Sequence, residues 1–280
     1  MIVILGSDGM LGRAFGNLYG SSAVCLTRAD CDFTNFTRLK RILNSIECSV
    51  LINCAAIVDM VYAESFEREA YDVNTLLPFN LAKYCNERGC KFVQISTDHY
   101  YLDSVKQHCE NSPVTLVNKY AIQKFTAEQL VLNSYRESLV VRTSILGYKN
   151  LDGKTFMEWV LKTLKWQKKI NGFNDAFTSS IDVASLCIFV ENAVYKGLSG
   201  IYNIGTREPY SKYALIQAVI DELELADIVL KKSSIKSLSL NRANSCGLNC
   251  DKYSEATETV LPTMYQTIKQ LNLKDTFRKI

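Results

Sequence analysis

Tyr120 and Lys124 form the pair in this sequence best suited to proton transfer. They lie in a segment with helical periodicity, and their spacing of four places both side chains on one face of a helix. A phenol titrates near pH 10, and a neighbouring ammonium lowers its pKa by favouring the ionised form. Such a tyrosine can protonate a carbonyl oxygen that receives a hydride. Amphipathic surface helices also produce this spacing by chance, so the pair needs support from other motifs.

A second motif, Ser96-Thr97-Asp98, directly follows a predicted strand. A hydroxyl at the carboxyl end of a strand can hydrogen-bond a substrate carbonyl and orient it. Serine and threonine at such positions also commonly cap an ordinary turn. Each motif is a modest signal taken singly, but their order and placement on one α/β pattern make chance agreement unlikely.

A glycine-rich loop, GSDGMLG at 6–12, separates the first predicted strand from the first predicted helix. Gly6 permits a tight turn, Gly9 permits close approach of a pyrophosphate, and Gly12 permits close packing of helix on strand. The free N–H groups of the helix N-terminus favour an anion. The loop predicts a dinucleotide site, although its GxxGxxG spacing differs from the usual GxGxxG.

The end of the second predicted strand carries both signals for the choice of cofactor. An acid such as Asp30 would bind the ribose 2′-hydroxyl of NAD, whereas an arginine such as Arg28 would favour the 2′-phosphate of NADP. Arg28 lies nearer the strand end and favours NADPH, but NADH stays open, and both side chains could equally be solvated loop charges.

Short apolar runs alternate with helical periodicity through the first 145 residues. The pattern predicts strands at 2–5, 23–26, 49–53, 91–95 and 139–142, with helices at 10–18, 34–44, 66–88 and 119–135. Runs that are apolar throughout are typical of parallel strands buried on both faces. The fold class expected is therefore α/β, a Rossmann-type doubly wound parallel sheet with ligands beyond the carboxyl ends of its strands.

After residue 146 the pattern changes and predicts a smaller C-terminal α/β substrate-binding cap. Helices are expected at 155–166, 181–195, 211–223 and 263–271, a strand at 200–204, and irregular structure at 147–153, 171–180 and 233–251. We expect a nucleotide-binding domain of residues 1–148 plus about 180–205. Residues 149–179 and 206–280 would form the cap.

Composition excludes several other classes. The net charge of +3 is small, and no run of basic residues predicts a nucleic-acid-binding face. The apolar runs are shorter than the roughly 18 residues of a membrane span, and the N-terminus is predicted to be a strand and not a signal peptide. The 10 cysteines form no CxxC pair, so no metal site is predicted and buried thiols in a reducing cytoplasm are expected.

Taken together, the motifs resemble the extended short-chain dehydrogenase/reductases, and within them the dTDP-4-dehydrorhamnose reductase family. The resemblance covers nearly the whole chain and is carried by GSDGMLG at 6–12, NCAA at 53–56, AES at 63–65, VN at 73–74, ISTD at 95–98, YAIQK at 120–124, VRTS at 141–144, IDVA at 181–184, YNIG at 202–205 and RANSCGLNCDK at 242–252.

The resemblance implies the site residue by residue. The catalytic residues would be Thr97, Asp98, Tyr120 and Lys124. The cofactor would lie against Gly6, Asp8, Gly9, Met10, Leu11, Gly12, Arg28, Asp32, Phe33, Asn53, Ala55, Ala56, Asn74, Tyr120, Lys124 and Thr143. The sugar nucleotide would meet Thr97, Phe177, Thr178 and Arg242. The implied reaction is reduction of a nucleotide-linked 4-keto-6-deoxy sugar by NADPH or NADH, in a cytoplasmic enzyme that could form a homodimer.

Departures from the family pattern leave alternatives open. Val61 and Tyr62 replace an acid-lysine pair, His99 begins an unusual segment after ISTD, and the 171–180 loop lacks the glutamine-x-glycine of the family. A nucleotide-sugar epimerase or dehydratase is one alternative, although His99 stands where a dehydratase usually has glutamate. A non-catalytic NADP-binding regulatory subunit, like the β subunit of methionine adenosyltransferase, is the other.

Overall fold

The computed structural model describes residues 1–152 and 154–280, which fall into two compact units. The first unit comprises Met1–Thr97, Leu116–Arg142 and Val190–Tyr202, and the second comprises Asp98–Thr115, Thr143–Phe189 and Asn203–Ile280. The second unit therefore begins earlier in the chain than the cap expected from the sequence. Gly153, at the end of the loop expected at 147–153, lies outside the described residues.

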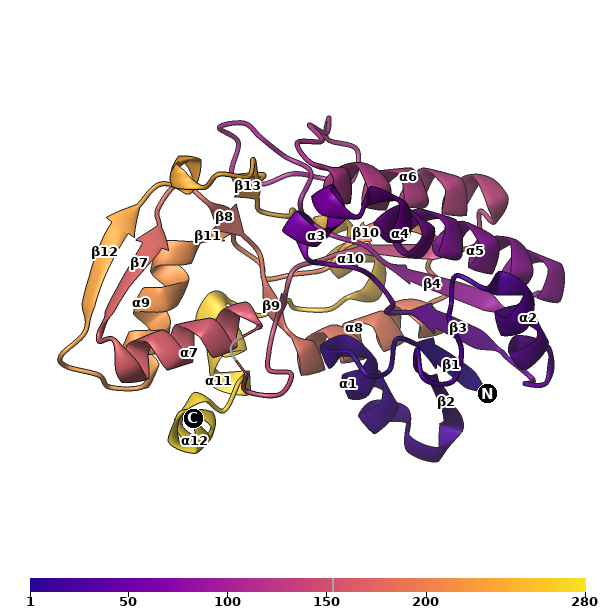
Figure 1. Cartoon of the computed structure of the whole chain (residues 1–280), viewed down its shortest axis with the longest axis horizontal. Coiled ribbons are helices and arrows are strands. Elements are labelled where there is room, and N and C mark those ends of the chain that lie inside the picture. The colour runs from indigo at the N-terminus through magenta and orange to yellow at the C-terminus, as the bar shows by residue number, and fades with distance from the viewer. Residues whose placement is uncertain (153) are drawn as a thin grey trace. The chain divides into compact units, whose positions relative to one another are not determined.

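A six-stranded sheet forms the centre of the first unit, in the order β10-β5-β4-β3-β1-β2 (Figure 1). The pairings of β1 with β2 and β3, of β3 with β4, and of β4 with β5 are all parallel. The strands are β1 (Ile2–Leu5), β2 (Ala23–Leu26), β3 (Val50–Asn53), β4 (Lys91–Ile95), β5 (Leu139–Arg142) and β10 (Gly200–Asn203). This confirms the predicted fold class, and the strand order reverses between β1 and β3, where such sheets bind ligands.

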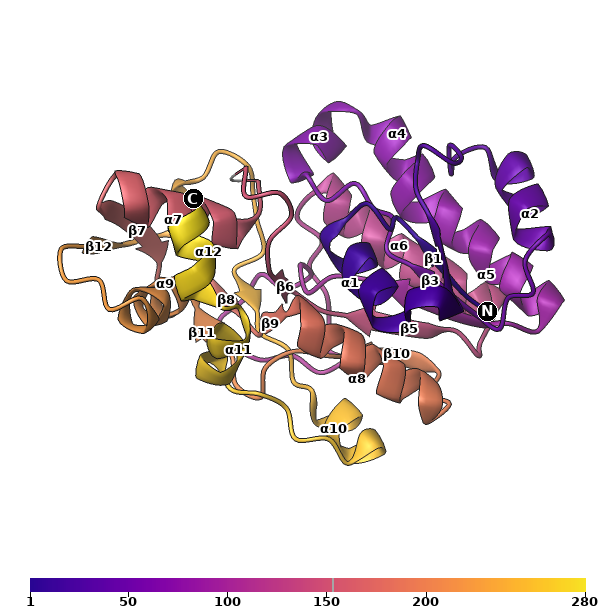
Figure 2. The same cartoon turned by 90° about the horizontal axis from the view of Figure 1, so that it is seen from below.

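Helices cover both faces of this sheet (Figures 1 and 2). On one face, side chains of α2, α5 and α6 join those of the strands in one apolar cluster that includes Val3, Leu51, Phe92, Leu39 and Leu81. On the other face lie α1 and the part of α8 that belongs to this unit. The helices are α1 (Met10–Tyr19), α2 (Phe36–Asn44), α3 (Met60–Ser65), α4 (Glu67–Tyr71), α5 (Leu77–Arg88), α6 (Lys119–Ser134) and α8 (Val183–Tyr195), with a short 3₁₀ turn η1 (Gly20–Ser22).

The long helix expected at 66–88 is divided into three parts. A π-helical turn, η2 (Asp72–Leu76), separates α4 from α5. Side chains from this turn are buried and bonded to neighbouring segments, since Asn74 bonds to the backbone of Ile57 and Thr75 donates to the carbonyl of Gln123. Single π-turns of this kind are frequent at functional sites.

The second unit is a mixed α/β body with its own apolar core, formed by α7, α9, α11 and the strands beside them. Its helices are α7 (Phe156–Trp166), α9 (Lys212–Glu222), α10 (Asp251–Thr257), α11 (Met264–Gln270) and α12 (Leu273–Lys279), with the 3₁₀ turn η3 (Ile235–Ser237). Its strands are β6 (Ile145–Leu146), β7 (Lys169–Phe173), β8 (Phe177–Thr178), β9 (Ile181–Asp182), β11 (Tyr210–Ser211), β12 (Val229–Ser233) and β13 (Ser245–Cys246).

The prediction of irregular structure at 171–180 was wrong for residues 171–173 and 177–178, which belong to strands. Residues 169–173 form β7, which pairs in parallel with β12, and residues 177–178 form β8 between β11 and β13. Gly172 lies within β7, and its lack of a side chain lets the backbone of Tyr213 approach closely. An added Cβ would lie 2.7 Å from the Tyr213 Cα.

Within the described part of the chain, no helix is long and apolar enough to span a bilayer.

Candidate active site

The glycine loop of the first unit has the shape that a dinucleotide phosphate requires. Gly6 has a φ of +77°, and a Cβ on Gly6 would lie 2.7 Å from the backbone nitrogen of Ala55. A Cβ on Gly12 would lie 2.3 Å from the carbonyl oxygen of Gly6, so loop and helix are in contact there. At Gly9, the N-cap of α1, an added Cβ would meet only the Gly6 oxygen, at 3.2 Å. The loop is thus packed tightly at Gly6 and Gly12, and at Gly9 it leaves room for an added Cβ only if the Gly6 carbonyl shifts slightly.

Two buried amides shape the backbone that follows β3. The Asn53 side chain accepts a hydrogen bond from the N–H of Ala55 at 3.1 Å and donates to Gln94 at 2.9 Å. The Asn74 side chain accepts from the N–H of Ile57 at 2.9 Å and donates to its carbonyl at 3.0 Å. Both residues were predicted to bind the cofactor, and within the protein their side chains hold the 54–57 turn beside the glycine loop.

At the end of β2 the two candidate residues for cofactor choice behave differently. The Asp30 carboxylate accepts hydrogen bonds from the hydroxyl and the backbone N–H of Thr27, at 2.7 and 2.8 Å, and these bonds lower its pKa. The Arg28 side chain is 80% exposed, and its nearest ion-pair partner is Asp8 at 4.0 Å. The Asp30 carboxylate is therefore already hydrogen-bonded within its own turn, whereas the Arg28 guanidinium is accessible to a ligand.

Of the two residues predicted to bind the adenine, Asp32 lies in a surface turn and Phe33 lies in the core. The Asp32 carboxylate accepts bonds from the N–H and hydroxyl of Thr34, at 2.9 and 2.7 Å, which lower its pKa. Phe33 is 4% exposed and belongs to the apolar core. Asp32 thus stabilises the turn that leads into α2.

The Tyr120–Lys124 pair lies on the buried face of α6, as its spacing predicted. Asn118 caps this helix by accepting from the N–H of Ala121 at 2.9 Å. Tyr120 is 7% exposed and Lys124 is 2% exposed. The Lys124 ammonium donates a 2.8 Å hydrogen bond to the carbonyl of Ile95, the last residue of β4. Burial lowers the pKa of Lys124 to about 8, opposed by the charge of Glu128.

Thr97 is 6% exposed and stands two residues beyond the carbonyl that Lys124 contacts. The first unit therefore combines Thr97, Tyr120 and Lys124 near the end of β4. Gly6 follows the end of β1 in the same parallel sheet, so the loop and these three residues lie at the same edge.

Asp98 belongs to the second unit, where it accepts a hydrogen bond from Thr178 at 3.3 Å. Thr178 and Ser144 each lie within hydrogen-bonding distance of Ser180, at 2.6 and 2.7 Å. Burial raises the pKa of Asp98 to about 6, and the positive charge of Lys212 opposes that increase. Asp98 can therefore take up and release a proton close to neutral pH.

His99 is buried beside Asp98 in the sequence. Its Nε2 accepts a hydrogen bond from the N–H of Ala243 at 3.2 Å, and its Nδ1 lies 3.8 Å from the Cys246 sulfur. Burial lowers the pKa of His99 to about 4, and the charge of nearby Arg242 contributes to the same direction. His99 is thus neutral at pH 7 and links the predicted substrate segment near Arg242 to the ISTD motif.

Phe177 and Arg242 were predicted to bind the substrate, and Thr143 was predicted to bind the cofactor. Phe177 lies in β8 with the Lys106 ammonium 4.9 Å from its ring centroid, and Arg242 is exposed. The Thr143 hydroxyl is buried, and no partner for it is found among the described residues. An orphaned buried hydroxyl at this predicted cofactor position fits a residue that bonds a ligand.

Sequence reasoning missed Gln94, Glu128 and Lys212. Gln94 is a buried polar side chain inside a parallel strand, which is itself an unusual signal. Glu128 continues the four-residue spacing of Tyr120 and Lys124, but that spacing alone does not distinguish it from a solvated charge on an amphipathic helix. Lys212 begins α9, and nothing in the sequence relates it to Asp98.

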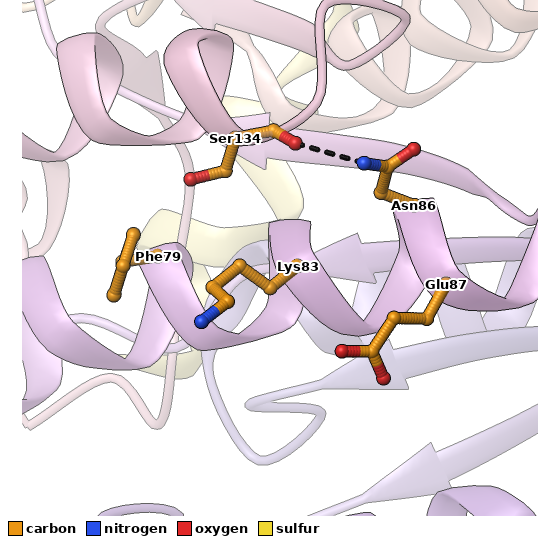
Figure 3. Close-up of a pocket in the computed structure, with 5 residues that line it drawn as sticks. All are labelled: Phe79, Lys83, Asn86, Glu87 and Ser134. Carbon is orange, nitrogen blue, oxygen red and sulfur yellow. Dashed lines mark hydrogen bonds between the residues drawn. The ribbon is translucent and has the colours of Figure 1, made fainter.

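A surface pocket of about 290 Å³ lies between α5 and α6, away from these residues (Figure 3). Its wall consists of Phe79, Lys83, Asn86, Glu87 and Ser134. The Asn86 amide donates to the Ser134 carbonyl at 3.1 Å and so joins the two helices. None of these residues was predicted to belong to the active site.

Among residues 1–152 and 154–280, no group of three or more His, Cys, Asp or Glu side chains is arranged to hold a metal ion.

A parallel sheet with a glycine loop after β1 and a buried Tyr–Lys pair beside β4 defines a Rossmann-type short-chain dehydrogenase/reductase. The chain belongs to the RmlD substrate binding domain family, whose model matches residues 1–276. This confirms the family resemblance inferred from the sequence motifs.

Several of the similar proteins are named dTDP-4-dehydrorhamnose reductase. The chain is 29% identical over 231 residues to the dTDP-4-dehydrorhamnose reductase of Mycobacterium tuberculosis, covering 79% of this chain and 75% of that protein. Its identity to the enzyme of the same name from Mycolicibacterium smegmatis is 28% over 221 residues, covering 75% of this chain and 66% of the relative. The structure of the Bacillus anthracis enzyme in complex with NADP matches with a TM-score of 0.89 at 20% identity, covering 98% of both chains, which shows a shared fold.

Proposed function

We propose that this protein reduces the 4-keto group of a nucleotide-linked 4-keto-6-deoxy sugar with NADPH or NADH. The observation that carries the proposal is the buried Lys124 ammonium bonded to the Ile95 carbonyl, one helical turn from Tyr120. The names of the relatives from both mycobacterial sources support the substrate class. The product would be a deoxysugar for a surface polysaccharide or another glycosylated product.

Each residue of the first unit has a distinct part in this reaction. A bound nicotinamide would supply the hydride to the keto carbon. Tyr120 holds the phenolic proton that the carbonyl oxygen receives, and Thr97 supplies a hydroxyl that can orient that oxygen. Lys124 places a positive charge one turn from the phenol and can bond the nicotinamide ribose. The glycine loop offers the N–H groups of α1 to the pyrophosphate, supported by Gly6, Gly9 and Gly12.

The exposed Arg28 supports NADPH as the preferred cofactor. Its guanidinium can form a bidentate contact with a 2′-phosphate, whereas the Asp30 carboxylate is already bonded to Thr27. The Bacillus anthracis relative was crystallised with NADP, which agrees with this preference.

The second unit would supply the groups that select the sugar nucleotide. Asp98 and Thr178 form one hydrogen-bonded cluster, and His99 lies near Arg242. Phe177 offers an aromatic ring in β8 for stacking. The sequence-based division, with residues 1–148 and about 180–205 as the cofactor domain and residues 149–179 and 206–280 as the substrate cap, remains a prediction. It differs from the two compact units in that it puts Asp98 and His99 in the cofactor domain.

We also propose that the enzyme acts in the cytoplasm and forms a homodimer. The cysteines of the chain carry free thiols, which suits a reducing compartment. A sugar nucleotide and a nicotinamide cofactor are substrates of that compartment. The oligomeric state can be measured by sedimentation or light scattering.

The test is the loss of reduced nicotinamide absorbance, with NADPH and NADH in parallel, on dTDP- and UDP-linked 4-keto-6-deoxy sugars generated in situ. Consumption that requires the sugar and disappears in Tyr120→Phe would support the reductase. Tight cofactor binding without consumption on any keto sugar would refute it, and would favour an epimerase that retains its cofactor or a regulatory NADP-binding protein.

A further inference from the structure

A buried carboxylate, Glu128, joins three elements of the first unit. It is 0% exposed and lies on α6, one turn beyond Lys124. The Ser96 hydroxyl donates to its Oε1 at 2.5 Å. The Arg142 guanidinium donates through Nη2 to Oε2 at 2.7 Å and through Nε to both oxygens at 3.1 Å.

The two residues that bond Glu128 are direct sequence neighbours of predicted site residues. Ser96 precedes Thr97 at the end of β4, and Arg142 precedes Thr143 at the end of β5. One carboxylate therefore ties the helix that carries Lys124 to the ends of two adjacent strands. Movement of any one of these elements would stretch hydrogen bonds that no water can replace, because Glu128 and Arg142 are both buried.

Stability alone does not explain this arrangement. A buried ion pair contributes little compared with an apolar pair of the same volume, because both charges lose their hydration. Apolar residues at these two positions would pack α6 on β5 equally well. The pair is better explained by what it does to the groups beside it.

The charge of Glu128 acts on Lys124 directly. The groups that face the Lys124 ammonium are the Ile95 carbonyl from β4, Cys54 from the turn after β3, and Glu128 from its own helix. Burial favours the neutral amine, whereas the carboxylate of Glu128 favours the charged form. Without Glu128, the ammonium would keep its bond to the Ile95 carbonyl but lose the carboxylate charge that opposes the effect of burial.

We propose that Glu128 is a positioning residue, which keeps Lys124 charged and holds Thr97 in place through Ser96. This inference rests on the proposed function, because it takes Lys124 and Thr97 as reacting groups. It goes further by assigning a role to a residue outside the Tyr–Lys and Ser-Thr motifs.

The Lys124 side chain can be titrated by NMR in the cofactor-free protein labelled with ¹³C-lysine, with its signal assigned by its loss in Lys124→Arg. We expect Glu128→Gln to lower the pKa of Lys124 by about one unit or more. Since this variant removes the carboxylate that bonds the buried Arg142, it can be too unstable to study. The double variant Glu128→Gln/Arg142→Met removes both charges and should fold; its downward shift should be smaller than that of Glu128→Gln, because loss of the Arg142 cation raises the pKa of Lys124.

Glu158→Gln is the matched control. Glu158 is also 0% exposed, but its carboxylate accepts hydrogen bonds from backbone N–H groups such as those of Lys149 and Thr155 in the second unit. This variant should lose stability without changing the titration of Lys124. An unchanged Lys124 pKa in the double variant, or an equal shift in the control, would overturn the proposed role of Glu128.

Ser96→Ala tests the second arm of the proposal. It breaks the link to Thr97 and leaves the Glu128 carboxylate in place, so kcat on a keto sugar should fall about tenfold or more while the Lys124 pKa is retained. An unchanged kcat would overturn the link between Glu128 and Thr97. If wild-type protein reduces no keto sugar, the proposed function fails, while the NMR titration still decides whether Glu128 controls Lys124.

Discussion

The Lys124 ammonium donates a 2.8 Å hydrogen bond to the carbonyl oxygen of Ile95, the last residue of a central strand. The same carbonyl accepts a 2.7 Å bond from the Gln94 amide, which in turn accepts from Asn53. A continuous set of buried hydrogen bonds therefore connects the turn after β3 with the proposed catalytic lysine. This connection explains why a polar Gln94 occupies the interior of a buried strand.

Replacement of the proton donor tests the chemistry directly. Tyr120→Phe removes the hydroxyl and keeps the ring, which packs near Ala63 and Ala70. We expect kcat to fall by about 10²- to 10⁴-fold, because general acid catalysis is lost. Cofactor affinity, measured by fluorescence of the reduced nicotinamide, should stay close to wild type. Equal turnover in the two proteins would show that Tyr120 is not the donor.

Two glycine variants separate cofactor binding from folding. Gly9→Val places its Cβ 3.2 Å from the Gly6 oxygen, a milder crowding than at Gly12, so the protein should lose less stability than Gly12→Val and lose about tenfold or more in cofactor affinity. Gly12→Val forces a Cβ to within 2.3 Å of the Gly6 oxygen, and should destabilise the fold by about 1–3 kcal/mol or more. Thermal unfolding and cofactor titration of both variants make the comparison. Unchanged affinity in Gly9→Val would refute the placement of the phosphate loop.

The choice between cofactors can be tested at Arg28. Arg28→Ala removes the exposed guanidinium and leaves the Asp30–Thr27 turn intact. The KM for NADPH should rise about tenfold or more, as expected for loss of a charged hydrogen bond, while the KM for NADH changes little. A similar loss for both cofactors would mean that Arg28 does not contact a 2′-phosphate.

Asp98 should show opposite effects on stability and activity. Its pKa in the folded protein is about 6, above the ordinary value of 3.8, so the folded state binds the proton more tightly than the unfolded state. The resulting stability is present below pH 3.8 and is lost as the pH rises through 6. Asp98→Asn mimics the protonated form, and should stabilise the protein at pH 8 by roughly 3 kcal/mol and much less at pH 4.

Denaturant unfolding of the wild type and Asp98→Asn at both pH values gives this difference. The activity of Asp98→Asn on the keto sugar should be lower than that of wild type at every pH. A stability gain of equal size at pH 4 and pH 8 would contradict a raised pKa of Asp98.

The sequence by itself determined the parallel sheet and the two motifs within it. The apolar run at 2–5 became a strand with those same bounds, because a strand buried on both faces needs continuous apolar side chains. The run at 91–95 also kept its bounds, although Lys91 and Gln94 interrupt its apolar character. The glycine loop and the Tyr120–Lys124 spacing are equally local, since a turn or a single helix face fixes them. Local rules therefore sufficed for the features whose geometry lies within one element or one junction.

Only the tertiary structure decided which distant residues act on these motifs. Glu128 was indistinguishable in sequence from a solvated charge on an amphipathic helix until Arg142 and Ser96 were found bonded to it. The β7–β12 pair was missed for the same reason, because its strands lie far apart along the chain and its register depends on their pairing. Burial and long-range pairing give such groups their chemistry, and both arise only when the chain has folded.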